Sequence, residues 1–175
     1  MSNNELVKIK KLGNKFFIFN AKDVEKLRCK HRIVGALDGT LTQAPLQNNY
    51  MGLPLVLLPE EVDLLLKKGF ATLTDPSQRI DLTENQKIRA TIFDYFWTKG
   101  YYITSGIKFG GDFLLYPNDP LVIHSQYIVH VVQDEENENV SPVDIVRMGR
   151  VATSTKKIAI LASPAIKLAI QWAGF

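Results

Sequence analysis

The segment between residues 113 and 124 contains a tyrosine and a histidine on either side of a Pro-x-x-Pro turn. Residues 113–116 are typical of a short buried strand, residues 117–120 of a turn, and residues 121–123 of a return to extended structure. We expect this turn to bring Tyr116 and His124 toward one place. Because an ordinary tyrosine titrates near ~10 and a histidine near ~6.5, such a pair can move protons to and from a hydroxyl or a phosphate ester. Each residue by itself is more often structural.

A third chemical group comes from the segment 149–162, where a basic, hydroxyl-rich stretch runs into an apolar strand expected over residues 157–162. A lysine at this junction has its stem in the core and its ammonium group near the backbone. Lys156 and Lys157 are adjacent, and the alternation of a strand sends them to opposite faces, so only one can reach a common site. From the residues alone, the default interpretation is two solvated lysines at the start of a strand.

Three motifs in the C-terminal half resemble those of the tRNA-intron endonuclease family. They are KFGGDFLLYPNDPLVIHS from Lys108 to Ser125, GRVATSTKK from Gly149 to Lys157, and the closing IQWAGF from Ile170 to Phe175. The N-terminal half resembles the same family at residues 35–37, 47–48 and 53–61. The resemblance covers nearly the whole chain, and within the family it is to the eukaryotic catalytic subunits that cut at the 3′ splice site.

This resemblance implies an endoribonuclease that uses neither a metal nor a cofactor. Tyr116 would take the proton from a 2′-hydroxyl of the RNA, His124 would give a proton to the leaving 5′-oxygen, and Lys157 would stabilise the charged phosphorus centre. The products would be a 2′,3′-cyclic phosphate and a 5′-hydroxyl. On residue chemistry alone the roles of Tyr116 and His124 can be exchanged. The histidine and cysteine spacings match no zinc motif, so no metal site is expected.

A second pair of residues concerns RNA binding. The resemblance implies that Arg150 and Trp172 hold a flipped intron base between a guanidinium group and an indole ring. Such a sandwich stacks on any base without reading its sequence. Judged only by residue type, Trp172 is more often a core residue, and Arg150 is more often a charge at a helix end.

Composition agrees with a compact protein that works with partners. The chain has 175 residues, is 46% hydrophobic, and contains one cysteine, Cys29, which fits a reducing compartment. No apolar run approaches the roughly 20 residues that a membrane-spanning helix needs, so no such helix is expected. The formal charge of +3 is mild for a nucleic-acid-binding protein. Partners are therefore expected to supply part of the RNA-facing surface.

The resemblance also implies which partners these are: intron-containing pre-tRNA, a second catalytic subunit and two structural subunits, which together form a heterotetramer. It implies a location in the nucleus, or at the mitochondrial outer surface in some fungi. The C-terminal segment 166–172 alternates apolar residues and is expected to form a sheet edge that a structural subunit covers. Two alternatives remain open, an archaeal-type enzyme that assembles from copies of itself and a non-catalytic structural or RNA-binding paralogue.

The fold class expected is α/β (α+β), in two domains. Residues 1–75 form a small N-terminal α/β domain, and residues 83–175 form a nuclease-like catalytic domain with a mixed sheet flanked by helices; between them, residues 74–79 have the turn chemistry of a linker. Helix starts are expected after Asn20, at Pro59, at the capping box of Thr83 and Gln86, and after Ser141. Strands are expected near residues 7–9, 15–19, 33–37, 101–104, 113–116, 123–132, 157–162 and 166–172.

Overall fold

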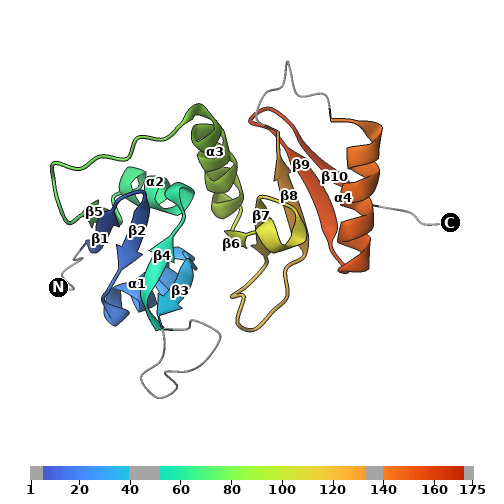
Figure 1. Cartoon of the computed structure of the whole chain (residues 1–175). Coiled ribbons are helices and arrows are strands. Elements are labelled where there is room, and N and C mark those ends of the chain that lie inside the picture. The colour runs from blue at the N-terminus through green and yellow to red at the C-terminus, as the bar shows by residue number, and fades with distance from the viewer. Residues whose placement is uncertain (1–5, 40–51, 133–139, 172–175) are drawn as a thin grey trace. The chain divides into compact units, whose positions relative to one another are not determined.

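The computed structural model describes residues 6–39, 52–132 and 140–171. Its contacts divide the chain into two compact units, Met1–Gln86 and Lys87–Phe175. Each unit contains one five-stranded sheet with helices packed on it (Figure 1). The expected α+β class with mixed sheets is therefore confirmed. None of the helices in the described ranges is both long enough and apolar enough to cross a bilayer.

The first sheet has the strand order β3-β4-β2-β1-β5, with β1 and β5 parallel and the other neighbours antiparallel. Val7 and Ile9 on β1 and Phe16 and Ile18 on β2 are buried, whereas the residues between them are more exposed. Because only alternate side chains are buried, the two helices of this unit cover one face of the sheet. The elements are β1 (Val7–Leu12), β2 (Lys15–Ile18), α1 (Ala21–His31), β3 (Ala36–Gly39), β4 (Gly52–Leu57), α2 (Pro59–Lys67) and β5 (Ala71–Leu73).

The second sheet has the order β10-β9-β8-β7-β6, in which only β8 and β9 are parallel. A buried cluster of Leu114, Ile128, Ala152 and Ala159 joins the sheet to α4, while Phe93 of α3 packs edge-on against Phe113. Successive strand residues point to opposite faces, so α3 and α4 cover opposite faces (Figure 1). The elements are α3 (Glu84–Thr98), β6 (Tyr102–Ser105), the 3-10 turn η1 (Ile107–Phe109), β7 (Phe113–Tyr116), β8 (Tyr127–Val131), α4 (Pro142–Ser154), β9 (Ile158–Ala162) and β10 (Lys167–Ile170).

The helix starts follow the cap residues that the sequence indicates. The side chain of Asn20 accepts a hydrogen bond from the N–H of Lys22 at 2.9 Å, and Ser141 accepts one from Asp144 at 3.2 Å. Thr83 and Gln86 form the reciprocal capping box, with backbone-to-side-chain distances of 3.0 and 3.3 Å. These bonds satisfy backbone donors that a helix start leaves without partners.

Several strand predictions were wrong. Residues 121–123 do not return to extended structure, and β8 begins at Tyr127 instead of near residue 123, because the N–H groups of residues 121–123 all bond to Asp119. Lys157 precedes β9, so strand alternation is not what separates it from Lys156. The strand expected near residues 33–37 begins at Ala36, and β4 and β5 were not predicted.

Candidate functional site

One row of backbone hydrogen bonds brings the three predicted catalytic residues to the same end of the second sheet. The N–H of Gln126 donates to the carbonyl oxygen of Leu115 at 2.9 Å, and the N–H of Ile158 donates to that of Gln126 at 2.9 Å. Tyr116 follows Leu115, His124 lies two residues before Gln126, and Lys157 precedes Ile158. All three therefore leave the sheet just beyond this row, although they are far apart in the sequence.

Tyr116 is half-buried at the end of β7. Its ring packs against the cluster under α4, and its phenol oxygen accepts a hydrogen bond of 3.4 Å from the hydroxyl of Thr104. Tyr102 pairs directly with Tyr116 across the two strands, and Thr104 pairs with Leu114. Because these four residues share one face of the sheet, β6 supports the tyrosine from the side.

His124 is exposed and lies at the end of a tight turn. Asp119 forms this turn: its carboxylate accepts the N–H of Leu121 at 2.8 Å, and its carbonyl oxygen accepts those of Val122 at 3.0 Å and Ile123 at 3.2 Å. Pro120 suits the first position of such a turn because it has no N–H to satisfy. The turn is part of the connection between β7 and β8, and it places His124 near the end of the sheet.

Lys157 lies at the carboxyl end of α4. The N–H groups of Lys156 and Lys157 bond to the carbonyl oxygens of Thr153 (3.0 Å) and Ala152 (2.7 Å), which is the Schellman pattern. Lys156 takes the left-handed backbone that this pattern requires, with φ 56°, and its side chain is exposed. The ammonium nitrogen of Lys157 donates to the carbonyl oxygen of Thr155 at 3.0 Å and lies 4.9 Å from the Phe109 ring centroid. The helix cap, and not strand alternation, separates the two lysines.

The site combines a phenol, an imidazole and an ammonium group at one sheet end. A tyrosine or histidine can accept or donate a proton, and an ammonium group at a helix carboxyl end can stabilise developing negative charge. Within the described residues, no group of three or more His, Cys, Asp or Glu side chains gathers to hold a metal ion.

The predicted RNA-stacking pair is only half described. Arg150 is exposed on α4, where it lines a shallow groove of about 310 Å³ with Val143, Val146, Arg147 and Val151. Trp172 lies outside the described residues.

Three residues that support the site were not predicted, namely Thr104, Phe109 and Asp119. Thr104 and Phe109 reach the site only through strand register and the turn at residues 106–111, which the sequence does not display. Asp119 had a local signal, because an Asp before a proline favours a turn in which the carboxylate accepts a following N–H.

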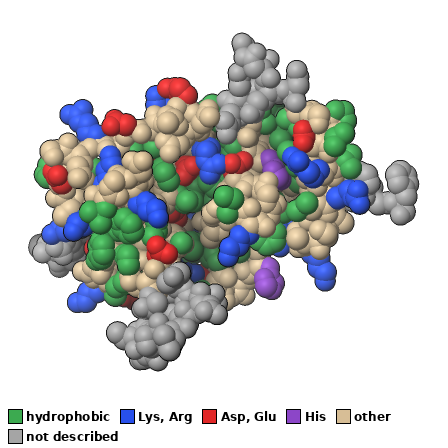
Figure 2. Space-filling view, viewed as in Figure 1, with side chains coloured by type: hydrophobic (Ala, Val, Ile, Leu, Met, Phe, Trp, Pro, Cys, Tyr) green, Lys and Arg blue, Asp and Glu red, His purple; other side chains and the backbone are tan. Residues whose placement is uncertain are grey.

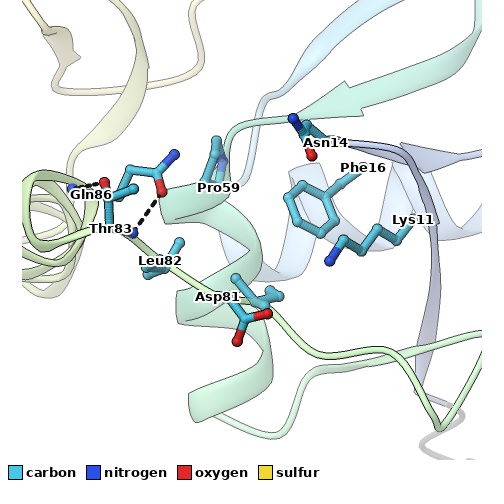
Figure 3. A pocket seen from close by; sticks show the side chains of 9 residues that line it. Lys11, Asn14, Phe16, Pro59, Asp81, Leu82, Thr83 and Gln86 are labelled. Carbon is cyan, nitrogen blue, oxygen red and sulfur yellow. Dashed lines mark hydrogen bonds between the residues drawn. The ribbon is translucent and has the colours of Figure 1, made fainter.

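The first unit contains a separate cavity of about 250 Å³ (Figure 3). Lys11 and Phe16 lie on one side of it, and Thr83 and Gln86 lie on the other. The ammonium group of Lys11 donates to the carbonyl oxygen of Arg79 at 2.8 Å, which ties the linker segment to β1. None of the predicted site residues lines this cavity.

Two family models match successive parts of the chain. The model described as "TSEN34-like, N-terminal domain" matches residues 7–76, and the model described as "tRNA intron endonuclease, catalytic C-terminal domain" matches residues 86–172. The second match contains Tyr116, His124, Lys157 and Arg150, and extends to Trp172.

Proteins with related sequences occur in eukaryotes and archaea. The human tRNA-splicing endonuclease subunit Sen34 is 36% identical over 92 residues, which cover 50% of this chain and 29% of the human protein. The Saccharomyces cerevisiae subunit SEN34 is 32% identical over 83 residues, or 44% of this chain and 30% of the yeast protein. The matched part thus spans less than a third of either relative. A tRNA-splicing endonuclease of Pyrobaculum arsenaticum is 31% identical over 137 residues, which cover 69% of this chain and 74% of that protein. On these matches, the chain belongs to the tRNA-splicing endonuclease family.

Proposed function

We propose that this chain is a catalytic subunit of a tRNA-splicing endonuclease and cuts intron-containing pre-tRNA at one intron junction, the 3′ splice site. The observation that carries the proposal is the backbone row of Leu115, Gln126 and Ile158, from which Tyr116, His124 and Lys157 all emerge. These residues lie within the part that matches the catalytic-domain model.

The proposed reaction is an internal transesterification. The 2′-oxygen at the junction forms a bond to phosphorus while the bond from phosphorus to the 5′-oxygen breaks. Tyr116 takes the 2′ proton, and His124, in its protonated form, gives a proton to the leaving 5′-oxygen. The ammonium group of Lys157 stabilises the added charge on the phosphate oxygens. The products carry a 2′,3′-cyclic phosphate and a 5′-hydroxyl, and the step uses no metal ion.

The supporting contacts fit these roles. The Thr104 hydroxyl donates to the phenol oxygen of Tyr116 and so stabilises negative charge there. His124 is exposed, which leaves its ring accessible to a large substrate. Lys157 contacts a carbonyl oxygen and an aromatic ring, neither of which neutralises its charge.

The proposed assembly is a nuclear heterotetramer with a second catalytic subunit and two structural subunits. The human and yeast relatives are both named as endonuclease subunits, which supports a multi-subunit complex. In this proposal Arg150 and Trp172 stack on an intron base. The alternative is an archaeal-type enzyme assembled from copies of this chain; the Pyrobaculum arsenaticum protein that matches 69% of this chain is named an endonuclease, without the word subunit.

The test uses the chain assembled with its partner subunits, intron-containing pre-tRNA and excess EDTA. Replacing His124 with alanine should lower cleavage at one junction by about 10² to 10⁴ while cleavage at the other junction continues. Ile123→Ala, in the same turn, is the matched control and should cleave normally. Product ends are identified by their reaction with phosphatase and kinase.

Four results would refute parts of the proposal. Unchanged cleavage by the His124→Ala complex would refute the assigned catalytic site. A requirement for Mg²⁺ in the chemical step would refute the metal-free mechanism. Equal loss at both junctions, or an active complex of this chain alone, supports the self-assembled alternative.

A further inference from the structure

The first sheet exposes one face to solvent, opposite to the face that α1 and α2 cover. Lys8, Lys10 and Thr72 are exposed on this open face, Phe17 is half-buried, and Phe19 just beyond β2 is 52% exposed. Phe17 pairs with Lys10 across β1 and β2, and Lys8 pairs with Thr72 across β1 and β5. The open face is therefore a continuous surface that runs over three neighbouring strands.

Two aromatic rings and a lysine contact one another on the open face. The centroids of Phe17 and Phe19 are 6.0 Å apart with a tilt of 33° between the rings, and the ammonium nitrogen of Lys10 lies 5.8 Å from the Phe19 centroid. A single exposed ring is common on protein surfaces, but exposed rings that contact each other and are bordered by polar residues are typical of a binding surface.

The strands beneath these rings are mostly basic, although Asp75 lies beside Lys10 at the end of β1. The strands β1 and β2 contain four lysines and neither Asp nor Glu, and β4 and β5 contain no acidic residue either. The single carboxylate in the strands of this sheet is Asp38, on the edge strand β3. Hydrophobic side chains gather over this sheet at the left of Figure 2, with Lys and Arg side chains and an acidic side chain at their border.

We propose that the open face of the first sheet binds single-stranded RNA, with bases stacked on Phe17 and Phe19 and the backbone phosphates near Lys8 and Lys10. Aromatic rings displayed on a sheet bind unpaired bases because every base offers a flat π-face, and neighbouring lysines supply the charge that phosphates need. Paired bases are hidden inside a duplex, so the face selects unpaired segments. The site lies in the first unit and is independent of the catalytic assignment.

A protein partner would depend on different properties of the open face than RNA does. An apolar face that docks protein depends on buried area, and leucine serves this purpose as well as phenylalanine. A face that stacks bases depends on the planar ring. The two occupants are therefore separated by replacing Phe19 with leucine, which keeps the apolar surface and removes the ring.

The experiment measures the affinity of the full chain for a fluorescent oligouridylate of roughly ten nucleotides, within the usual site size. Phe17→Ala and Phe19→Ala should each weaken binding by about fivefold or more, the equivalent of one lost stacking contact. Phe19→Leu should weaken it similarly, and Phe19→Trp should preserve it. Ile166→Ala, an exposed apolar residue of the second unit, is the control and should bind normally.

Two further measurements test the contribution of the lysines and the preference for unpaired RNA. Lys10→Gln should reduce the slope of log affinity against log salt by about 0.7, whereas Lys30→Gln, on α1 away from the open face, should not. A single-stranded competitor should displace the probe and an RNA duplex should not. Wild-type affinity in Phe19→Leu, or equal competition by duplex, overturns the proposal. The probe has no splice junction and its binding is measured without cleavage, so a failure of this proposal is distinct from a failure of the catalytic one.

Discussion

The ammonium nitrogen of Lys157 lies 4.9 Å from the centroid of the Phe109 ring, at the carboxyl end of α4. The ring turns its electron-rich face toward the charge, and the carbonyl oxygen of Thr155 accepts a hydrogen bond from the same nitrogen. These two contacts hold a positive charge at the sheet end where Tyr116 and His124 emerge.

We expect Lys157→Met to lower pre-tRNA cleavage by about 10² to 10³, because it removes the group that stabilises charge in the transition state. The matched control is Lys156→Met, whose parent side chain is exposed and belongs to the left-handed residue of the helix cap. Single-turnover cleavage of saturating pre-tRNA measures the chemical step. Equal losses in the two variants would show that the pair acts only through general attraction of RNA.

Thr104 is expected to position and polarise Tyr116. Thr104→Val keeps the shape of the side chain and removes the hydroxyl that donates to the phenol oxygen, so the cleavage rate should fall by about fivefold, the equivalent of one hydrogen bond. Thr104→Ser retains the hydroxyl and should restore the rate. A purely structural role predicts the opposite order, because serine loses the methyl group and valine keeps the volume. Rates at saturating RNA and thermal unfolding temperatures distinguish these outcomes.

Glu61 should make the stability of the first unit depend on pH. Burial raises the pKa of its carboxyl to about 7, against the opposing effect of hydrogen bonds from the backbone of Leu58 and Gly35. Between pH ~4.5 and ~7 the folded chain keeps the proton and the unfolded chain loses it, so the free energy of unfolding falls as the pH rises through this window. The total effect is of the order of 3 kcal/mol.

The variant Glu61→Gln does not titrate, and we expect its stability to change less between pH 5 and pH 8 than that of the wild type. His31 acts in the opposite direction, since burial lowers its pKa and its contribution is lost as the pH falls. The comparison between variant and wild type therefore isolates Glu61. Urea unfolding at both pH values measures the difference, with the exposed Glu25→Gln as control. Parallel pH profiles for Glu61→Gln and wild type would contradict the assignment.

The edge strand β10 should carry part of the contact with a partner subunit. Ile166 and Leu168 are 65% and 55% exposed, whereas Ile170 packs against the buried cluster under α4. Replacing Ile166 and Leu168 with lysine should release the partner in a pull-down without lowering the unfolding temperature, because neither side chain belongs to the core. Val143→Lys, on the exposed side of α4, is the control. Co-purification of the double variant at wild-type yield would place the assembly surface elsewhere.

Local features of this protein follow from the sequence itself. The strand at residues 113–116, the caps at Asn20 and Ser141, and the capping box of Thr83 and Gln86 depend on side chains within a few residues of one another. Such short-range chemistry is visible in the order of the residues. The family motifs around Tyr116, His124 and Lys157 are likewise continuous segments, which is why the sequence sufficed to nominate them.

Tertiary structure decided how these segments meet. The strand pairing that places Gln126 between Leu115 and Ile158 joins residues that are 11 and 32 positions apart in the chain, and a shift of one residue would turn Tyr116 to the other face. The pairing of β6 with β7 brings Thr104 next to Tyr116. The cap at the carboxyl end of α4, and not a strand, sets the orientation of Lys157. Long-range register depends on the packing of whole faces against α3 and α4, so the composition of any one segment does not reveal it.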